Sequence, residues 1–300
     1  MLLIIGGVVL VLASVACGFL LENGKPLVLF QPSEFLIIVG GAVGVLLAGN
    51  PRRNLGRLAG ALLAMRHHCN YTPEFYKQLL KLLYTLFSFG RRKGTGSLAE
   101  QMEKPTKSEL FTAYPIILHD SEALSFLCDS VRLAEAAGLE PSELDDLMIV
   151  DLDVQRNASH QMVTSLTSVA DALPGLGIVA AVLGVVVTMQ AIEGPASEIG
   201  NKVAAALVGT FLGILLCYGV VGPVASHLSS RNKAKAEFLH VVRAGVVAFQ
   251  KGASPVVAAE FARRSIPSDL RPTFDQMEYE LRRNTKVTGS EPAPVAEKAG

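Results

Sequence analysis

The chain has 300 residues, of which 27 are Lys or Arg and 27 are Asp or Glu, so its formal net charge at neutral pH is zero. Half of the residues are hydrophobic, only 18% are charged, and the mean hydropathy is +0.39. This composition excludes an intrinsically disordered chain, which is poor in apolar residues and high in net charge. It also argues against nucleic-acid binding, because no basic surplus is available to neutralise phosphates.

Most of the apolar residues fall in four long stretches without a charged side chain, residues 1–21, 35–50, 172–192 and 203–226. A membrane-spanning helix needs about 17 to 25 apolar residues, so three stretches are long enough as they stand. Pro32 and Ser33 can lengthen the second by a turn. We therefore predict membrane helices over 1–21, 32–50, 171–192 and 203–226. The alternative is that these are buried helices of a large soluble core.

The first stretch differs from a secretory signal peptide in two respects. No Lys or Arg precedes its apolar residues, and it is longer than a typical signal core. Ala16-Cys17 resembles a lipoprotein cleavage site, but Ser14 is a poor residue three positions before Cys17. We predict that 1–21 is a transmembrane helix.

The distribution of basic residues near the helix ends predicts the orientation in the membrane. Arg52, Arg53 and Arg57 follow the second stretch, and Arg231 and Lys233 follow the fourth, whereas the loops 22–31 and 193–202 hold one Lys each. Since Lys and Arg accumulate on the cytoplasmic side, both termini, the segment 51–170 and the segment 227–288 are expected inside the cell. The tail 289–300 is expected to be disordered because it is rich in Pro, Ala and Glu.

The segment 51–170 is too long for a loop and is predicted to fold into helices. Thr72-Pro73-Glu74 is typical of a helix start, and the basic residues 91–93 followed by Gly94 are typical of its end. The segment 97–100 reads as a capping box that opens a short helix ended by Pro105. Asp120 is expected to cap a helix that runs to Gly138.

Two longer helices are expected to join this segment and the tail to the membrane. Pro141 opens a helix with many acidic residues, which leads into the third span. The fourth span is expected to continue inward to about Gln250. We find no segment with the alternating pattern of a β-strand and no internal repeat, so the fold class is all-α: a polytopic membrane protein with four transmembrane helices and a helical cytoplasmic domain.

Motifs for enzyme chemistry or resident cofactors do not stand out. His67-His68-Cys69 could bind a metal, but no second cluster at ligand spacing completes a site, and surface histidines are the alternative that we favour. The acidic series from Glu143 to Asp153 is interpreted as a solvated helix face rather than a cation site, since no calcium-binding loop accompanies it. The sequence lacks a phosphate-binding loop and a nucleophile–base motif. We expect neither enzyme activity nor a cofactor, and no disulfide among the four cysteines.

Small residues recur four positions apart in the predicted spans, at Gly40 and Gly44, at Ala180 and Gly184, and at Gly209 and Gly213. This spacing favours close helix packing in lipid.

Pro174 and Pro223 lie near the inner ends of the third and fourth spans, where each removes a backbone donor. A simple kink and a functional hinge are both open interpretations. Thr188 and Thr210 could line an ion path, although a threonine in a membrane helix most often bonds its own backbone.

The predicted spans hold no acidic or basic residue deep in the membrane, and Asp171 lies at an edge. Ion transport through a bilayer normally uses a buried ionisable group. The chain therefore either moves no ions or uses a carboxylate that a partner helix supplies.

Several motifs in order along the chain resemble those of the MotA flagellar stator subunits, in the MotA/TolQ/ExbB proton channel superfamily. Residues 171–186 read DALPGLGIVAAVLGVV, residues 208–219 read VGTFLGILLCYG, and Gly222-Pro223 follow. Further support comes from 31–34, 108–115, Pro255, 260–261 and 271–274. The resemblance covers almost the whole chain.

The resemblance implies a pentameric ring of these subunits around two copies of a MotB-like partner, which has one membrane helix with an essential Asp and a domain that binds peptidoglycan. Protons crossing through that Asp would turn the ring, and the cytoplasmic domain would push the rotor switch protein of the flagellum. The partners implied are thus a MotB-like subunit, a rotor protein, further copies of this chain and the lipid bilayer.

The resemblance also implies roles for single residues. Pro174 and Pro223 match prolines beside the proton path, and Thr210 matches a polar residue of that path. Ala181 occupies the position of a Thr in sodium-driven relatives, and because alanine cannot coordinate Na⁺ through its side chain, protons are the expected ion.

Contact with the rotor is expected at Arg91, with Arg92 adjacent. The acidic contact of the family aligns with Ala99 here. Its neighbour Glu100 either substitutes for that contact or only caps its helix.

Two other functions are considered. An energiser of outer-membrane transport, like ExbB or TolQ, usually has three spans and a different end topology. A membrane scaffold that conducts nothing is the alternative from another class. Four spans with a large cytoplasmic segment between the second and third favour the MotA family.

Overall fold

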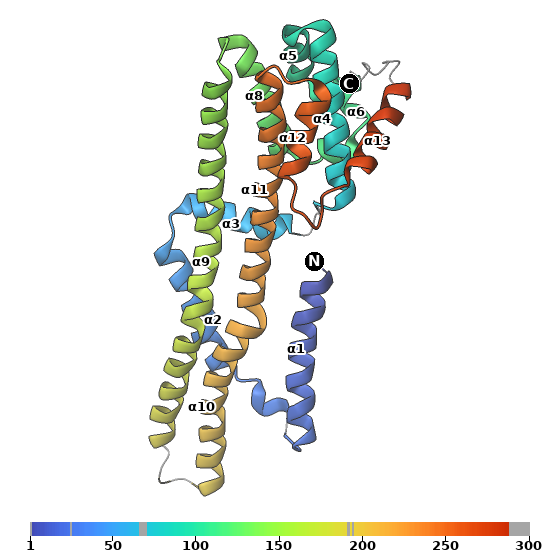
Figure 1. Cartoon of the computed structure of the whole chain (residues 1–300). Helices are drawn as coiled ribbons and strands as arrows, with labels where there is room; N and C mark the ends of the chain where they lie inside the picture. Colours follow the sequence, from blue (N-terminus) through green and yellow to red (C-terminus); the bar gives the residue numbers. More distant parts are fainter. Residues whose placement is uncertain (1, 25, 66–70, 191–192, 194, 288–300) are drawn as a thin grey trace. The chain divides into compact units, whose positions relative to one another are not determined.

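The structure is a computed structural model that describes residues 2–24, 26–65, 71–190, 193 and 195–287. Every secondary-structure element in these ranges is a helix, which confirms the all-helical prediction (Figure 1). Four of the described helices are long and apolar enough to cross a membrane. The chain forms two compact units, residues 1–68 with 157–232, and residues 69–156 with 233–300. The domain limits predicted from the sequence, which divide the chain at the membrane surface, stay predictions.

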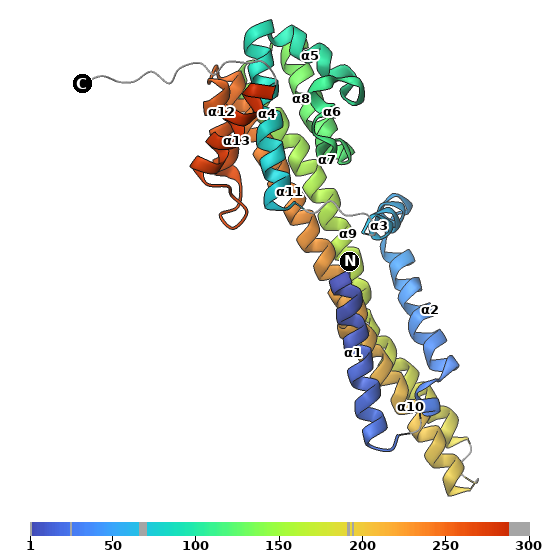
Figure 2. The ribbon, with the colours of Figure 1, turned by 90° about the vertical axis from the view of Figure 1, so that its right-hand side faces the viewer.

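The first unit, called the membrane unit below, contains the four candidate spans. It consists of α1 (Leu2–Leu21), η1 (Pro26–Leu29), α2 (Pro32–Gly49), α3 (Arg52–Ala64), the later part of α9 (Pro141–Met189), α10 (Ala196–Leu216), the π-helix η3 (Cys217–Val221) and the start of α11 (Gly222–Gln250). Within this unit α1 and α2 lie on different sides of the pair formed by α9 and α10 (Figures 1 and 2).

Local signals explain where two of the span-bearing helices begin. Pro32 opens α2 as expected, because a proline fits the first helical turn, where no backbone hydrogen bond is lost. The helix that holds the fourth span begins at Ala196, seven residues before the predicted span 203–226. Its added turns are polar, and Lys202 Nζ lies 3.0 Å from a carboxylate oxygen of Glu198, four residues earlier.

Helix α3 is a feature of the membrane unit that the sequence analysis did not identify. Its buried side includes Leu58, which joins an apolar cluster with Leu166 of α9 and Leu228 of α11. Gly56 and Gly60 lower its intrinsic helix propensity, so its stability comes from this packing rather than from local signals. Arg231 of α11 donates a hydrogen bond of 2.9 Å to the carbonyl oxygen of Ala64, at the end of α3.

The second unit is a helical domain that contains α4 (Pro73–Lys93), α5 (Thr95–Glu103), η2 (Pro105–Lys107), α6 (Glu109–Thr112), α7 (Pro115–Leu118) and α8 (Ser121–Ala137). It also contains the start of α9, the end of α11, α12 (Pro255–Ser265) and α13 (Phe274–Val287). Its helices gather around one core, which includes Tyr76, Leu83, Phe87, Phe111 and Phe238.

The predicted ends of α4 and α8 are confirmed. The Thr72 hydroxyl accepts the Phe75 backbone N–H at 3.3 Å, and α4 ends at Gly94, whose φ of 90° a glycine adopts without strain. Asp120 accepts the Ala123 N–H at 3.1 Å, and Gly138 ends α8 with φ 61° in the left-handed region. These ends depend on residues close in sequence, and local pattern is therefore sufficient to predict them.

The predicted start of α5 is wrong. The helix begins at Thr95, so Ser97 lies inside it and makes no capping bond. The reason is Gly94, whose positive φ ends α4 and turns the chain directly into α5, leaving no loop for a later start. Glu100 consequently does not close a capping box and lies exposed on the helix.

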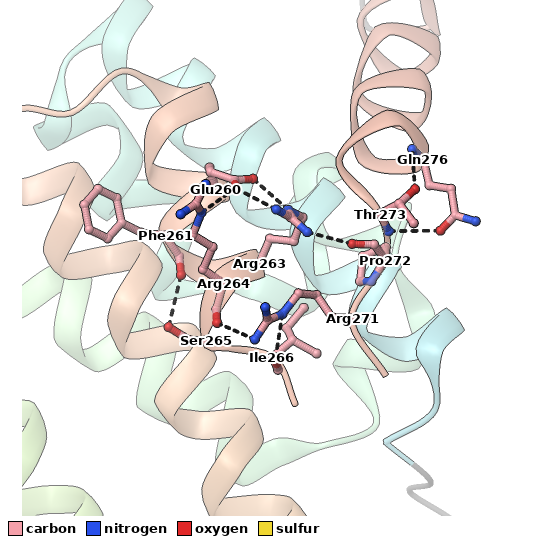
Figure 3. A network of polar contacts seen from close by, with 10 residues as sticks. All are labelled: Glu260, Phe261, Arg263, Arg264, Ser265, Ile266, Arg271, Pro272, Thr273 and Gln276. Atoms are coloured by element: carbon pink, nitrogen blue, oxygen red, sulfur yellow. Dashed lines mark hydrogen bonds and ion pairs between the residues drawn. The ribbon is translucent and has the colours of Figure 1, made fainter. Parts of the chain in front are cut away.

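Helices α12 and α13 are joined by a polar network built from charged side chains and backbone carbonyls (Figure 3). Arg263 donates two hydrogen bonds of 2.7 Å to the two carboxylate oxygens of Glu260, and a third of 2.9 Å to the Pro272 carbonyl. Arg271 donates to the carbonyls of Ile266 and Arg264 at 3.0 and 2.9 Å. The arginines thus hold the turn 266–273 against the end of α12.

The start of α13 is fixed by a reciprocal capping box, also drawn in Figure 3. The Thr273 hydroxyl accepts the Gln276 N–H at 3.2 Å, and the Gln276 side chain accepts the Thr273 N–H at 3.1 Å. Two backbone donors that a helix start leaves unpaired are satisfied in this way. The segment 271–274 therefore combines an arginine that closes the turn with the cap of the next helix.

Glu260 is expected to make the α12–α13 region sensitive to acid. Its hydrogen bonds to Arg263 hold the pKa of this carboxyl below its ordinary value of 4.5. A lowered pKa means that the ion pair stabilises the fold above the ordinary value, and that this stabilisation is lost as the pH falls through the lowered pKa. Glu260→Gln should destabilise the region by about 1.5–3 kcal/mol, the range for hydrogen bonds to charged groups.

Hydrogen exchange of residues 255–287, measured at neutral and acidic pH in detergent, checks this expectation. The wild type should lose protection on acidification, whereas the Glu260→Gln protein should start with less protection and change little. Asp275→Asn, an exposed acidic residue of α13, is the matched control. Equal protection of the wild type and Glu260→Gln at neutral pH would contradict the assignment.

Candidate functional site

Helices α9 and α10 of the membrane unit pack through Gly177, Gly184, Gly209 and Gly213, which we call the glycine seam. A methyl group on Gly213 would lie 2.6 Å from the Leu173 carbonyl oxygen, and one on Gly177 would lie 2.8 Å from the Gly209 carbonyl oxygen. Contacts this short are possible only because neither residue has a side chain. The two backbones therefore touch each other directly, as small residues allow in membrane helices.

The small-residue spacing predicted this packing for two of its three pairs. Ala180 is 1% exposed, and the methyl position of Gly184 lies 2.7 Å from the Ala206 Cβ atom. The third pair differs, because Gly40 and Gly44 meet no atom within 4 Å in this chain. In α2 the packed glycine is Gly41, whose methyl position lies 2.7 Å from a methyl carbon of Leu176.

Two of the predicted ion-path residues, Ala181 and Thr210, lie on the seam from facing helices. The Ala181 backbone nitrogen is 3.2 Å from the methyl position of Gly209, and the Thr210 Cα atom is 3.3 Å from that of Gly177. Thr188, the other candidate, is completely buried and its hydroxyl donates to the Gly184 carbonyl at 2.8 Å. The Thr188 hydroxyl thus bonds to the backbone of its own helix, which was the alternative to a place in the ion path.

Pro174 lies inside α9, which continues without interruption from Pro141 to Met189. Its nitrogen carries no hydrogen, so the carbonyl of Ala170 has no partner at the usual helical position. One residue before the proline, the Leu173 carbonyl oxygen faces Gly213 in the seam. The backbone hydrogen bond that α9 lacks is therefore close to the contact between α9 and α10.

Pro223 is preceded by a π-helical segment, Cys217–Val221. The Gly222 N–H bonds to the carbonyl of Cys217, five residues back, instead of the carbonyl four residues back. The wider turn accommodates the proline at the start of α11, and Pro223 itself is exposed in this chain. Short π-helical turns within α-helices are frequent at functional sites.

A cavity of about 390 Å³ lies between the later part of α9 and the segment η3–α11. Polar groups on its wall include Thr167, Asp171, Tyr218 and Ser226. Asp171 lies in the turn before Pro174, and Gly222, another wall residue, is next to Pro223. Both prolines thus lie within three residues, along the chain, of a wall residue of this cavity. The cavity is lined by hydroxyl groups and one carboxylate, which are groups that can exchange protons.

Glu34 is a buried carboxylate that the sequence analysis did not single out. It lies in the first turn of α2 and is only 5% exposed. Its Cγ atom lies 3.2 Å from the methyl position of Gly209, and its Oε1 atom lies 3.6 Å from that of Gly184. Its position before an uncharged stretch was visible in the sequence, but its burial depends on three helices meeting.

Arg91, Arg92 and Glu100, the predicted rotor contacts, all lie on the surface of the second unit. The Arg91 guanidinium donates at 3.3 Å to the Gly252 carbonyl, and that of Arg92 donates at 3.3 Å to the Ser88 carbonyl. Because Gly94 joins α4 directly to α5, the arginines and Glu100 belong to consecutive helices.

Ala99, which aligns with the acidic contact of the resembled family, is half-buried. Glu135 of α8 adds a carboxylate near the start of α5, with Oε1 3.3 Å from the methyl position of Gly96. No signal in the sequence pointed to Glu135, because it is 35 residues after Glu100.

Metal-binding chemistry finds no support in the part of the chain that the structure describes, where no group of three or more His, Cys, Asp or Glu side chains could hold an ion. The cluster His67-His68-Cys69 lies outside the described residues. In the acidic series of α9, Asp145 pairs with Arg243 at 2.6 Å.

Cys17, Cys128 and Cys217 are free thiols, and burial raises the pKa of Cys128 to about 12.

Two family models match most of the chain. Residues 4–94 match the model of the motility protein A N-terminal region, and residues 119–240 match that of the MotA/TolQ/ExbB proton channel family. The second match contains the glycine seam, Pro174 and Pro223.

Relatives and solved structures agree with these matches. The chain is 36% identical to motility protein A of Escherichia coli K12 over 94% of this chain and 95% of the relative. It is 37% identical to the chemotaxis protein LafT of Vibrio parahaemolyticus, over 91% and 95% of the two chains. The fold is similar to a chain in the structure of C. jejuni MotAB, with a TM-score of 0.75, 19% identity and coverage of 91% and 99%.

Proposed function

The chain belongs to the MotA family of flagellar motor stator subunits, within the MotA/TolQ/ExbB proton channel family, and on this premise we propose that it conducts protons together with a MotB-like partner subunit. In the proposal, a pentameric ring of this chain surrounds two copies of the partner, whose other end binds peptidoglycan. The MotA/TolQ/ExbB family is one of channels rather than enzymes. The matches to motility protein A in particular favour a stator subunit over an ExbB-like energiser.

The observation that supports a partner is the placement of the charged groups. Within the described residues of the predicted spans 1–21, 32–50, 171–192 and 203–226, the acidic and basic side chains are Glu34, at the start of α2, and Asp171, at an edge of the third span. Between these two carboxylates the spans present only uncharged side chains. A carboxylate on the partner's single membrane helix would supply the missing ionisable group in the middle of the membrane.

The seam residues support protons as the transported ion. Ala181, at the position that the resemblance assigns to a Thr in sodium-driven relatives, offers no side-chain oxygen. Na⁺ has to be coordinated by several oxygen atoms, whereas a proton needs only a chain of groups that can accept and release it. We therefore assign Thr210 and Ala181 to a proton path.

Pro174 and Pro223 are proposed to couple protonation to a change in helix shape. Each proline weakens the backbone hydrogen bonding of a long helix beside the cavity that Asp171 lines. Such weak points are where a helix can bend at low energetic cost. In this proposal, the bending of α9 and α11 turns the ring around the partner.

Contact with the rotor is proposed at the exposed end of α4 and on α5. Arg91, Arg92 and Glu100 are exposed there and carry both signs of charge. Exposed charges position a partner and speed its encounter more than they add affinity. This fits a rotor contact that has to form and break repeatedly, with the second unit and both termini in the cytoplasm.

The experiment that tests the function compares the chain alone with the chain plus its partner. Both samples are reconstituted into liposomes that hold a pH-sensitive dye, and proton entry is measured under an imposed membrane potential. We expect proton entry only with the partner, and its loss when the partner's membrane Asp is changed to Asn. Proton entry at the same rate through the chain alone would contradict the proposal.

A further inference from the structure

We propose that Glu34 is a proton relay on the outer side of the membrane, which takes a proton from outside water and passes it toward the carboxylate of the partner helix. The proposal rests on the proposed function, because it assumes that protons flow through the complex. It goes beyond that function by assigning the uptake step to a carboxylate of this chain. The proton enters on Glu34 and leaves to the partner's carboxylate, so Glu34 is unchanged after each transfer.

The burial of Glu34 is the first observation. Its residue is 5% exposed although its helix begins only two residues earlier, at Pro32. An acidic residue in the first turn of a helix is common because it complements the helix dipole, but that role needs no burial. An ionisable residue enclosed by membrane helices is costly and usually functional.

The surroundings of the carboxylate are the second observation. Ser33 Oγ donates a hydrogen bond of 2.7 Å to Oε2, and Oε1 has no hydrogen-bond partner among the described residues. Lys202, a cation in the first part of α10, is paired with Glu198. A carboxylate with a purely structural role would be paired or fully hydrogen-bonded, whereas Glu34 keeps one oxygen available.

The facing helices leave room for the carboxylate instead of offering it donors. The atoms of Glu34 lie beside Gly184 of α9 and Gly209 of α10, at 3.6 and 3.2 Å from the positions where methyl groups would be. Side chains at these two positions would crowd the carboxyl group. Because both residues are glycines, space for the Glu34 carboxyl group is left between α2, α9 and α10.

The same glycine connects Glu34 to the predicted proton path. The methyl position of Gly209 lies 3.2 Å from the Glu34 Cγ atom and also 3.2 Å from the Ala181 backbone nitrogen, and Thr210 is the next residue in the chain. With the segments 22–31 and 193–202 outside, as the distribution of Lys and Arg predicts, the start of α2 faces the outer solution. Glu34 thus lies between the outside and the seam, and Asp171 lies toward the inner end.

The test uses the complex with its partner in liposomes and in motile cells, with three variants. Glu34→Gln keeps the size and polarity but cannot exchange a proton, and Glu34→Asp keeps the carboxyl group. Glu22→Gln removes an exposed acidic residue of the outer loop and is the control. We expect Glu34→Gln to assemble with the partner and to reduce proton flux about 100-fold, the lower range of what a positioned proton-transfer group contributes.

Glu34→Asp should recover a large part of the flux, and Glu22→Gln should match the wild type. A conducting wild-type complex with equal flux in Glu34→Gln would overturn the relay alone. A wild-type complex that conducts nothing would overturn the proposed function, and the relay with it.

A second measurement covers the case in which Glu34→Gln fails to assemble. Difference infrared spectroscopy of the wild-type complex, during pH steps on the outer side, should show the carbonyl band of a neutral carboxylic acid that appears and disappears. This band should shift in Glu34→Asp, because the environment of the carboxyl group changes. No pH-dependent band, or one that is identical in Glu34→Asp, would overturn the relay.

Discussion

Replacing Gly213 with alanine is expected to prevent α9 and α10 from packing and to remove the folded complex from the membrane. The added methyl group would lie 2.6 Å from the Leu173 carbonyl oxygen and 2.9 Å from the Gly177 Cα atom. Both neighbours are backbone atoms, so no side-chain rotation relieves the clash and the helices have to separate. Overpacking a core costs about 1–3 kcal/mol, and we expect a cost at or above the upper end because the obstacle is backbone.

The amount of complex in purified membranes and its thermal stability in detergent measure this effect. Gly200→Ala is the matched control, because it is the same substitution in the same helix at a glycine with no atom within 4 Å of its methyl position. Gly177→Ala should resemble Gly213→Ala, since its methyl group would meet the Gly209 carbonyl at 2.8 Å. Normal stability of Gly213→Ala would show that α9 and α10 are not held at this separation.

Much of the fold is predictable because its signals are local. The ends of α4 and α8 depend on Thr72, Gly94, Asp120 and Gly138, each within a few residues of the atoms that it caps. The four spans depend on the length of apolar stretches, which is a property of the chain alone.

Features that depend on other parts of the chain were missed. Helix α3 is stabilised by Leu166 and Leu228, more than a hundred residues away. The start of α5 was placed three residues late because Gly94 both ends one helix and begins the next. A capping box is a sound local signal, but the backbone conformation of the preceding glycine decides whether the chain can use it.

The candidate site was predictable in its residue types but not in its arrangement. The spacing of Gly209 and Gly213 indicated close packing, and the structure shows which partner they pack against. Glu34 was visible only as the residue before an uncharged stretch. Its burial follows from the approach of α9 and α10 at two glycines, which no pattern in residues 31–50 contains.

Pro174→Ala is expected to have effects of opposite sign on stability and on motility. Proline in a helix interior costs about 3 kcal/mol relative to alanine, because its nitrogen cannot donate to the carbonyl four residues earlier. Alanine would restore a bond from residue 174 to the Ala170 carbonyl and stiffen α9 where it meets α10. We expect a higher melting temperature of the complex and loss of swimming, since a stiffer helix cannot bend when the path is protonated.

Pro141→Ala provides the comparison on the same helix. Pro141 is the first residue of α9, where no helical hydrogen bond is available to restore, so both stability and swimming should stay near the wild-type values. Swimming speed in cells that lack the native subunit, together with the amount of complex in their membranes, separates a motor defect from an assembly defect. A Pro174→Ala protein that assembles and swims at the wild-type speed would show that the break in α9 is a structural kink and not part of the coupling between protons and rotation.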